Sequence, residues 1–305
     1  TPAADARAFG VFGFQEVGTG VAGLAVQLGA RVDRYAITAR ESEKFGPGAH
    51  RTFDALSGSI GLRIPLVAGL TGGVTAARSF RAPTVEELFS GAAHAGTGAV
   101  EYGDAALREE RGRSVEAVLH LRTARLNGQF AAYTNRIDNY IQLTFVRDTV
   151  LGSATLPVYA YAQAPATLQG VEGSVEVALH RHVAASVRGD WLHAEQRDGT
   201  PLSFMPAPRA GLTLRWDDGR FSLGGDVHHE LHQTRSGPAD EGPTDAHTIL
   251  RVDAGARFGM AGRAHAVTLR VDNLRNASYR EATSRIKDFA PAPGRNIALV
   301  YRTWF

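Results

Sequence analysis

The sequence contains no cysteine, so its 305 residues form neither a disulfide nor a thiolate metal site. Lysine is nearly absent too, because Lys44 and Lys287 are the only two among 33 basic residues and the rest are arginine. The 31 acidic residues offset this basic charge to a net +2, and no basic block stands out. We therefore expect no nucleic-acid partner.

Long apolar runs are also missing, and none approaches the ~18 residues that a membrane-spanning helix requires. The first residues, Thr1-Pro2-Ala3-Ala4-Asp5, do not show the basic and then apolar pattern of a signal peptide. We expect this start to be the interior of a longer protein.

Signatures of enzymes are missing as well, since neither a phosphate-binding loop nor a nucleophile–base spacing occurs. His228-His229-Glu230-Leu231-His232 is superficially similar to a zinc-protease motif, but that motif needs a helix to bring its histidines together. This segment alternates as a strand instead. We therefore predict no enzymatic activity and no resident cofactor.

What the chain does contain is repeated alternation of apolar and polar residues with a period of two. In the run from Val21 to Ala39, Leu24, Val26 and Leu28 share one face, and Gln27 and Arg31 share the other. A period of two is typical of a strand with two different faces. Apolar residues outward and polar residues inward are the pattern of a transmembrane β-barrel.

About thirteen such strands are predicted, joined by short turns and long loops in strict alternation. The short turns are expected near Gly18, Pro65, Asn127, Arg181, Asp218 and Gly262. The long loops are expected near Glu43, Gly91, Thr149, Gly199, Asp240 and Ser284. This asymmetry predicts an all-β fold, a transmembrane antiparallel up-and-down β-barrel, with a soluble β-sandwich or β-helix as the alternative. Pro83 predicts one or two helical turns before Phe89.

Two stretches carry a family resemblance. Ser79-Phe80-Arg81-Ala82-Pro83, followed by Glu86-Glu87-Leu88-Phe89, resembles one signature of TonB-dependent outer-membrane receptors. Asn273-Leu274, Tyr279 and Pro293-Gly294-Arg295-Asn296, before a last strand ending in Phe305, resemble the C-terminal end of the same family. Arg275 departs from the pattern, because the family usually has Phe after Asn-Leu.

The resemblance implies that residues 1–305 are the C-terminal portion of a barrel of roughly 22 strands, without its plug domain and first strands. It also implies a location in the outer membrane of a Gram-negative bacterium and energised uptake of a scarce nutrient. The implied partners are the TonB complex acting through the plug, outer-membrane lipids and lipopolysaccharide, and the barrel assembly machinery, which would recognise Phe305. A passive porin or an adhesin is the alternative from another functional class.

A row of possible metal ligands lies on the predicted strand from Phe221 to Thr234. The candidate ligands on its lumen face are Asp226, His228, Glu230 and His232. Imidazole and carboxylate together suit zinc and similar ions. Residues two apart on a strand are separated by nearly 7 Å, so further ligands must come from elsewhere, and we expect His247 on the next strand and His94 in a long loop. The alternative is a solvated polar wall without a metal.

A second resemblance indicates which substrate is transported. Arg280-Glu281 and Lys287-Asp288-Phe289-Ala290-Pro291 resemble the subgroup of these receptors that takes up zinc, although the histidine that often follows in that subgroup is missing here. The resemblance implies zinc as the transported ion. An iron–siderophore, or another metal chelate, is the alternative substrate.

Overall fold

The structure is a computed structural model in which residues 1–21, 23–43 and 45–304 are described. Ala22, Lys44 and Phe305 lie outside the described residues. The expected assembly signal, Phe305, is therefore among the residues that the structure does not describe. Thirteen strands follow one another in a single antiparallel sheet, so the predicted number of wall strands is confirmed. No helix in the described ranges has the length and apolar character to cross a membrane.

Each wall strand pairs with the next one in the chain. The wall strands are β1 (Ala4–Gly18), β2 (Ala25–Ala39), β3 (Ala49–Val67), β4 (Leu70–Arg81), β7 (Glu110–Arg122), β8 (Leu126–Leu151), β9 (Ala154–His180), β10 (Val183–Gln196), β11 (Arg209–Asp217), β12 (Phe221–Glu230), β13 (His247–Met260), β14 (Arg263–Asp272) and β15 (Asn296–Trp304). The connection after β4 holds the helix α1 (Val85–Phe89) and two short strands, β5 (Gly91–His94) and β6 (Ala99–Tyr102).

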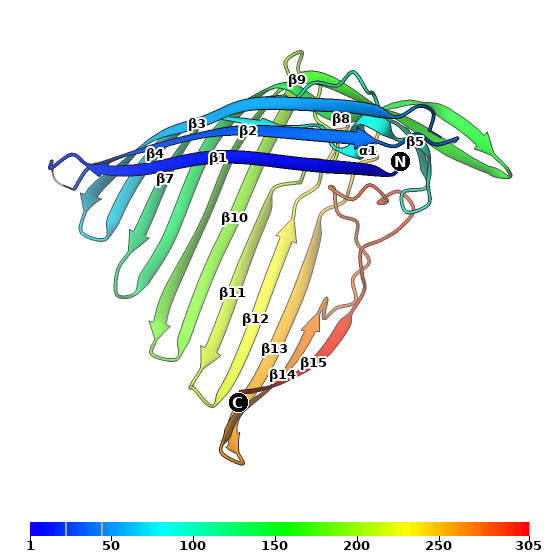
Figure 1. The fold of residues 1–305 in the computed structure, drawn as a ribbon. Coiled ribbons are helices and arrows are strands. Elements are labelled where there is room, and N and C mark those ends of the chain that lie inside the picture. The colour runs from blue at the N-terminus through cyan, green and yellow to red at the C-terminus, as the bar shows by residue number, and fades with distance from the viewer. Residues whose placement is uncertain (22, 44, 305) are drawn as a thin grey trace.

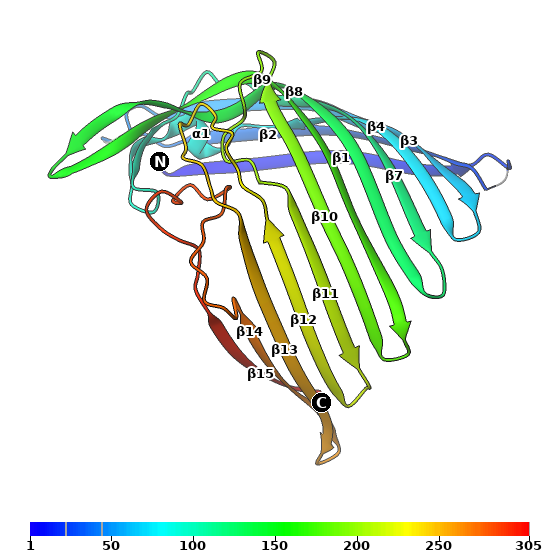
Figure 2. The same cartoon turned by 180° about the vertical axis from the view of Figure 1, so that it is seen from behind.

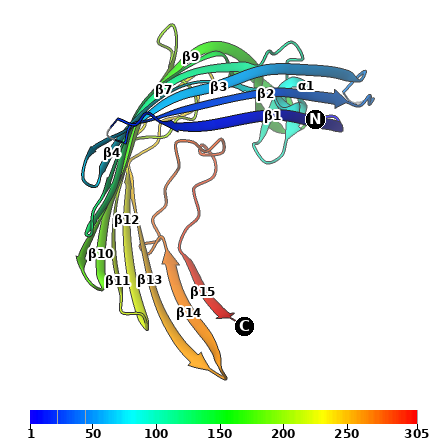
Figure 3. The ribbon, with the colours of Figure 1, turned by 60° about the vertical axis from the view of Figure 1, so that its left-hand side comes forward.

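The sheet curves into a trough that is open along one side (Figure 3). β1 forms one edge and β15 the other, and within the described residues these two strands do not pair with each other. The architecture is therefore an up-and-down barrel wall, as the alternation predicts, and it is unclosed in this chain.

The connections sort by length onto two opposite rims (Figures 1 and 2). Short turns such as residues 181–182, 218–220 and 261–262 lie on one rim, and α1, β5 and the long loops lie on the other. In the turn 218–220 the Asp218 carboxylate accepts hydrogen bonds from the backbone N–H groups of Arg220 (2.8 Å) and Phe221 (2.7 Å). Gly219 adopts φ +93°, which explains the Asp-Gly pair in this turn.

One predicted long loop is wrong. The segment between Leu143 and Leu156 is not irregular, because β8 continues to Leu151 and β9 begins at Ala154. Thr144 to Val150 is rich in β-branched and aromatic residues, which favour strands. The face alternation stops here because two register shifts, after Ile137 and after Phe145, interrupt the pairing. The hairpin therefore projects beyond the sheet (Figures 1 and 2).

The outward face of the wall is a continuous apolar surface. Val187, Leu212, Val227 and Leu250 are register partners across β10 to β13. Val187 is 58% exposed and Leu212 50% exposed, although both are large and aliphatic. An apolar surface that extends over so many strands is unfavourable in contact with water. The pattern is that of a barrel wall facing lipid, with its polar face turned to the lumen.

Near the long-loop rim, the concave side holds a small core beneath α1. The buried side chains of this core are Ile37, Phe53, Leu88, Leu107 and Ile141. The helix begins with a capping box, in which Thr84 and Glu87 each accept a hydrogen bond from the other's backbone N–H. The short helix predicted after Pro83 is therefore confirmed, and Leu88 fixes it to the wall.

Candidate functional site

The lumen face of β10 to β13 carries three neighbouring rows of residues that are register partners. From the rim inward, these rows are Asp190–Arg209–Glu230–His247, Arg188–Gly211–His228–Ile249 and Ser186–Thr213–Asp226–Arg251. Neighbouring strands lie about 4.8 Å apart, so side chains of one row are close neighbours. The alternation therefore places acidic, basic and imidazole groups together on one patch of the wall.

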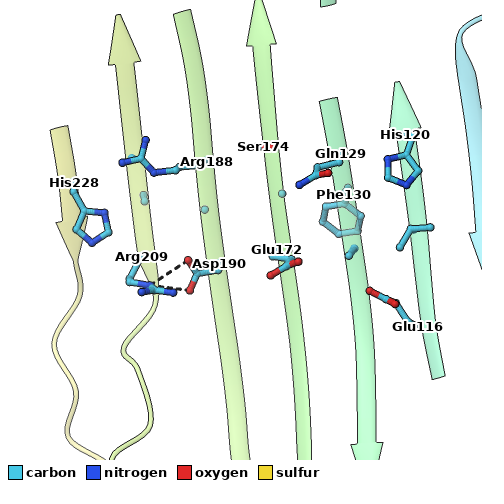
Figure 4. A pocket seen from close by; sticks show the side chains of 16 residues that line it. Glu116, His120, Gln129, Phe130, Glu172, Ser174, Arg188, Asp190, Arg209 and His228 are labelled. Atoms are coloured by element: carbon cyan, nitrogen blue, oxygen red, sulfur yellow. Dashed lines mark hydrogen bonds and ion pairs between the residues drawn. The ribbon is translucent and has the colours of Figure 1, made fainter. Parts of the chain in front are cut away.

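Two adjoining hollows open on this patch. The first, of about 470 Å³, extends from His228 across β10 and β9 to Glu116 and His120 on β7 (Figure 4). The second, of about 360 Å³, extends from His228 to His247 and is roofed by residues of the loop between β14 and β15. Arg188, Arg209 and His228 line both hollows.

The three arginines that line the hollows are each paired with a carboxylate of the wall. Arg188 donates to Asp226 at 2.8 Å, and Thr213 donates to the same carboxylate oxygen at 2.7 Å. Arg209 forms an ion pair with Asp190 at 3.0 Å, drawn as dashed lines in Figure 4. Ion pairs of this kind hold the side chains in fixed positions on the wall. The imidazole of His228 lies on the strand next to Arg209 and lines both hollows (Figure 4).

Four of the six predicted ligands line one hollow, namely Asp226, His228, Glu230 and His247. They do not form a complete site, because nowhere in residues 1–21, 23–43 and 45–304 do three His, Asp or Glu groups converge closely enough to hold a metal ion. Asp226 is engaged by Arg188 and Thr213, which reduces its freedom to turn toward an ion.

The other two predicted ligands lie elsewhere. β12 ends at Glu230 and not at Thr234, so His232 does not continue the row. Opposite Leu231, just before β11, lies Pro208, which has no N–H to donate to the ladder. Only its carbonyl takes part, accepting a hydrogen bond from the backbone N–H of Leu231. The imidazole of His232 instead lies 3.7 Å from the fully exposed Asp245. His94 belongs to β5, and it does not line either hollow.

His247 is the least satisfied polar group in the second hollow. Its ring stacks on Tyr279, with centroids 4.5 Å apart, while its Nδ1 is buried and has no hydrogen-bond partner in the described structure. Glu230, its register partner, is only 8% exposed. A buried polar atom without a partner is costly, so it indicates a position where another group can bind.

The sequence argument missed the arginines of this patch. Arg188, Arg209 and Arg251 have the lumen parity on adjacent strands, and that shared parity is the signal that could have revealed them. The loop residues Tyr279 and Glu281 also line the second hollow, but a loop has no periodicity from which their direction follows.

The stretch that resembles the zinc subgroup mainly organises its own loop. Lys287 is 2% exposed, and its ammonium donates to the Ala282 carbonyl at 3.4 Å. Burial lowers the pKa of Lys287, although nearby Glu241 and Asp288 favour its charged form. Arg280 donates to the Lys287 carbonyl. Arg280 and Lys287 hold the loop above the hollow without lining it, and Glu281 is the residue of this stretch that does line it.

This architecture matches that of known proteins. Residues 1–274 match the family model described as TonB dependent receptor-like, beta-barrel. The copper transporter OprC shares the fold with a TM-score of 0.83 at 17% identity, over 99% of this chain and 48% of OprC. A ferric enterobactin receptor from Pseudomonas aeruginosa aligns with a TM-score of 0.67 at 15% identity, over 99% of this chain and 54% of that one.

The ferric citrate transporter FecA aligns similarly, with a TM-score of 0.72 at 14% identity over 98% of this chain and 44% of FecA. The chain therefore spans about half the length of these structures. The family match covers most of the sequence, and the fold matches over nearly all of it. This chain belongs to the TonB-dependent receptor β-barrel family.

Proposed function

We propose that this chain forms part of the wall of an outer-membrane receptor that takes up a metal ion with energy from the TonB complex. The family supplies the transport mechanism, and structural neighbours named for copper, ferric enterobactin and ferric citrate support a metal-containing substrate. The plug that would transmit the pull of TonB, and the first strands, would lie in parts of the receptor beyond this half barrel. No chemical step on the substrate is required.

Among metals, we propose zinc or a similar borderline ion. The observation that carries this proposal is that Glu230 and His247 are register partners and line the same hollow as His228. The Nδ1 atom of His247 is buried and has no hydrogen-bond partner in the described structure. Nitrogen and oxygen donors together suit such an ion. The wall offers an incomplete set, so the remaining ligands would come from the plug or from the strands that close the barrel.

A ferric chelate is the second candidate, favoured by the three arginines on the same patch. Arg188, Arg209 and Arg251 could bind the carboxylates or catecholates of an anionic chelate. Each of them already forms an ion pair with a carboxylate of the wall, which opposes this use. The arrangement therefore supports the metal ion more than the chelate.

Calorimetry on the full-length receptor tests this choice. In the double variant His228→Ala/His247→Ala we expect zinc affinity to fall on the order of tenfold or more, because two nitrogen donors are lost. The matched control is His180→Ala/His182→Ala, which removes two imidazoles from the turn on the opposite rim and should bind zinc as the parent does.

Two outcomes would contradict the proposal. If His228→Ala/His247→Ala binds zinc as tightly as the parent does, the patch is a polar wall and not a metal site. Tight binding of ferric citrate or a ferric catecholate, with no measurable binding of zinc, would support the chelate instead.

A further inference from the structure

Three arginines stand side by side on the outward face of the wall, near the rim of the long loops. Arg78 on β4 is the register partner of Arg113 on β7, and Arg113 is the register partner of Arg136 on β8. Arg78 lies three residues before the end of β4, and Arg113 three residues after the start of β7. We call these three residues the arginine ladder.

The ladder faces outward because its neighbours along each strand do. One step toward the opposite rim, the partners of the next row are Ile60, Ala76, Val115 and Thr134. Ile60 is 54% exposed and Val115 48% exposed, as lipid-facing residues of the wall are. The ladder therefore lies on the outward face of the wall, directly on the long-loop side of this apolar row.

Cationic side chains directly opposite one another on paired strands destabilise a sheet. Here only Arg113 is paired with a carboxylate in the described structure: Asp138 lies 2.5 Å from it, and the side chains of Asp138 and Arg113 are 45% and 70% exposed. In the described structure, neither Arg78 nor Arg136 has an ion-pair partner. The ladder thus carries an excess of positive charge that the chain itself does not neutralise.

Beside the ladder lies a groove with an apolar floor. It has a volume of about 730 Å³, and Leu56, Ile60 and Val115 line it together with the three arginines. Small residues, Gly58 and Ala76, separate the larger aliphatic side chains and leave the groove open between them. An aliphatic groove that ends at a cluster of guanidinium groups matches a molecule with an acyl chain and a phosphorylated headgroup.

We propose that the arginine ladder binds the phosphate groups of lipopolysaccharide in the outer leaflet, and that the groove beside it receives an acyl chain. Guanidinium groups bind phosphate oxygens in a bidentate manner, and strands about 4.8 Å apart space three of them over roughly 10 Å. The bound phosphates would offset the repulsion between the arginines. This inference rests on the proposed membrane location of the wall and is independent of the transported substrate.

The test uses full-length receptor purified in detergent and placed in nanodiscs of phosphatidylcholine, with lipopolysaccharide added as the probe. We expect the triple variant Arg78→Gln/Arg113→Gln/Arg136→Gln to retain lipopolysaccharide at least about tenfold less well than the parent. A triple lysine variant at the same positions should bind more tightly than the glutamine variant but less tightly than the parent, because it keeps the charge and loses the bidentate geometry. Folding is checked by heat modifiability, and zinc calorimetry should be unchanged, which separates this test from that of the transport proposal.

The matched control removes three arginines from the lumen face, Arg31→Gln/Arg63→Gln/Arg215→Gln, and should bind lipopolysaccharide as the parent does. Three results would overturn the proposal. Retention could be equal in the glutamine variant and the parent, or lipopolysaccharide freed of its phosphates could bind equally well. Alternatively, the ladder could hold two copies of the receptor together, in which case the parent would be a dimer and the glutamine variant a monomer.

Discussion

Replacing Arg81 by alanine should release α1 and the loop behind it from the wall. The guanidinium of Arg81 donates to Glu87 on α1 at 2.9 Å and to Glu110 on β7 at 2.6 Å. Glu110 in turn accepts from the backbone N–H of Ile141 on β8 at 2.7 Å. One arginine thus joins three wall strands to the helix.

The expected effect is large because both carboxylates are nearly buried, with side chains 12% and 10% exposed. Removing one partner of a buried ion pair leaves charge without compensation, and we expect the free energy of unfolding to fall by about 3 kcal/mol. The measurement is the temperature at which the folded barrel converts to the unfolded form, together with the rate of tryptic cleavage in residues 90–109.

The control for this prediction is Arg34→Ala, which breaks an ion pair with Asp54 whose side chains are 68% and 66% exposed. An exposed pair contributes little, so this variant should unfold as the parent does. If Arg81→Ala is no less stable than Arg34→Ala, then the cluster around Arg81 does not anchor the helix.

Replacing Asn273 by alanine should loosen the loop between β14 and β15. Asn273 is 3% exposed and adopts φ +49°, a backbone conformation that asparagine tolerates better than alanine. Its side chain accepts from the Ala277 N–H at 2.8 Å and donates to the Ala277 carbonyl at 2.9 Å. We expect the free energy of unfolding to fall by about 3 kcal/mol, from lost hydrogen bonds and from the strained backbone.

The variant Asn273→Gly separates these two causes, because glycine adopts positive φ freely but makes no side-chain hydrogen bond. Its loss of stability should be smaller than that of the alanine variant and still measurable. Both variants are compared by hydrogen exchange of the loop residues 277–295. Parent-like exchange in the alanine variant would show that the loop does not depend on Asn273.

These two residues show what the two signature stretches do in this chain. The Ser79 to Phe89 stretch supplies a strand end, a capping box and the arginine that joins them to the wall. The Asn273-Leu274 pair ends β14 and turns the chain into its last long loop. Both signatures are loop anchors, which is the structural interpretation that their residue types favour.

The wall was predictable from the sequence because one rule governs it. Alternation with period two fixes which face each residue takes, and turn chemistry such as Asp218-Gly219 fixes where the strand reverses. The rule fails where the pairing slips. After Ile137 and Phe145 the register shifts, so the outer part of β8 and β9 does not follow the alternation that identifies the other strands.

The candidate site was only partly predictable, for a similar reason. Parity placed Asp226, His228, Glu230 and His247 on one hollow, but it could not show that β12 ends at Glu230 and leaves His232 outside. Opposite Leu231 lies Pro208, which has no N–H to continue the ladder. Contacts between distant loops, such as that of Arg285 with the buried Glu101, leave no trace in local periodicity.

The most direct test of the account is the side of the membrane on which each rim lies. Residues 1–305 contain no cysteine, so one introduced at Arg197 on the long-loop rim or at Arg181 on the short-turn rim is the single cysteine of this part of the receptor. Intact cells that produce the full-length receptor are treated with a membrane-impermeant maleimide, and permeabilised cells serve as the control. The account predicts labelling of Arg197→Cys in intact cells and of Arg181→Cys only after permeabilisation. Labelling of Arg181→Cys from outside intact cells would contradict it.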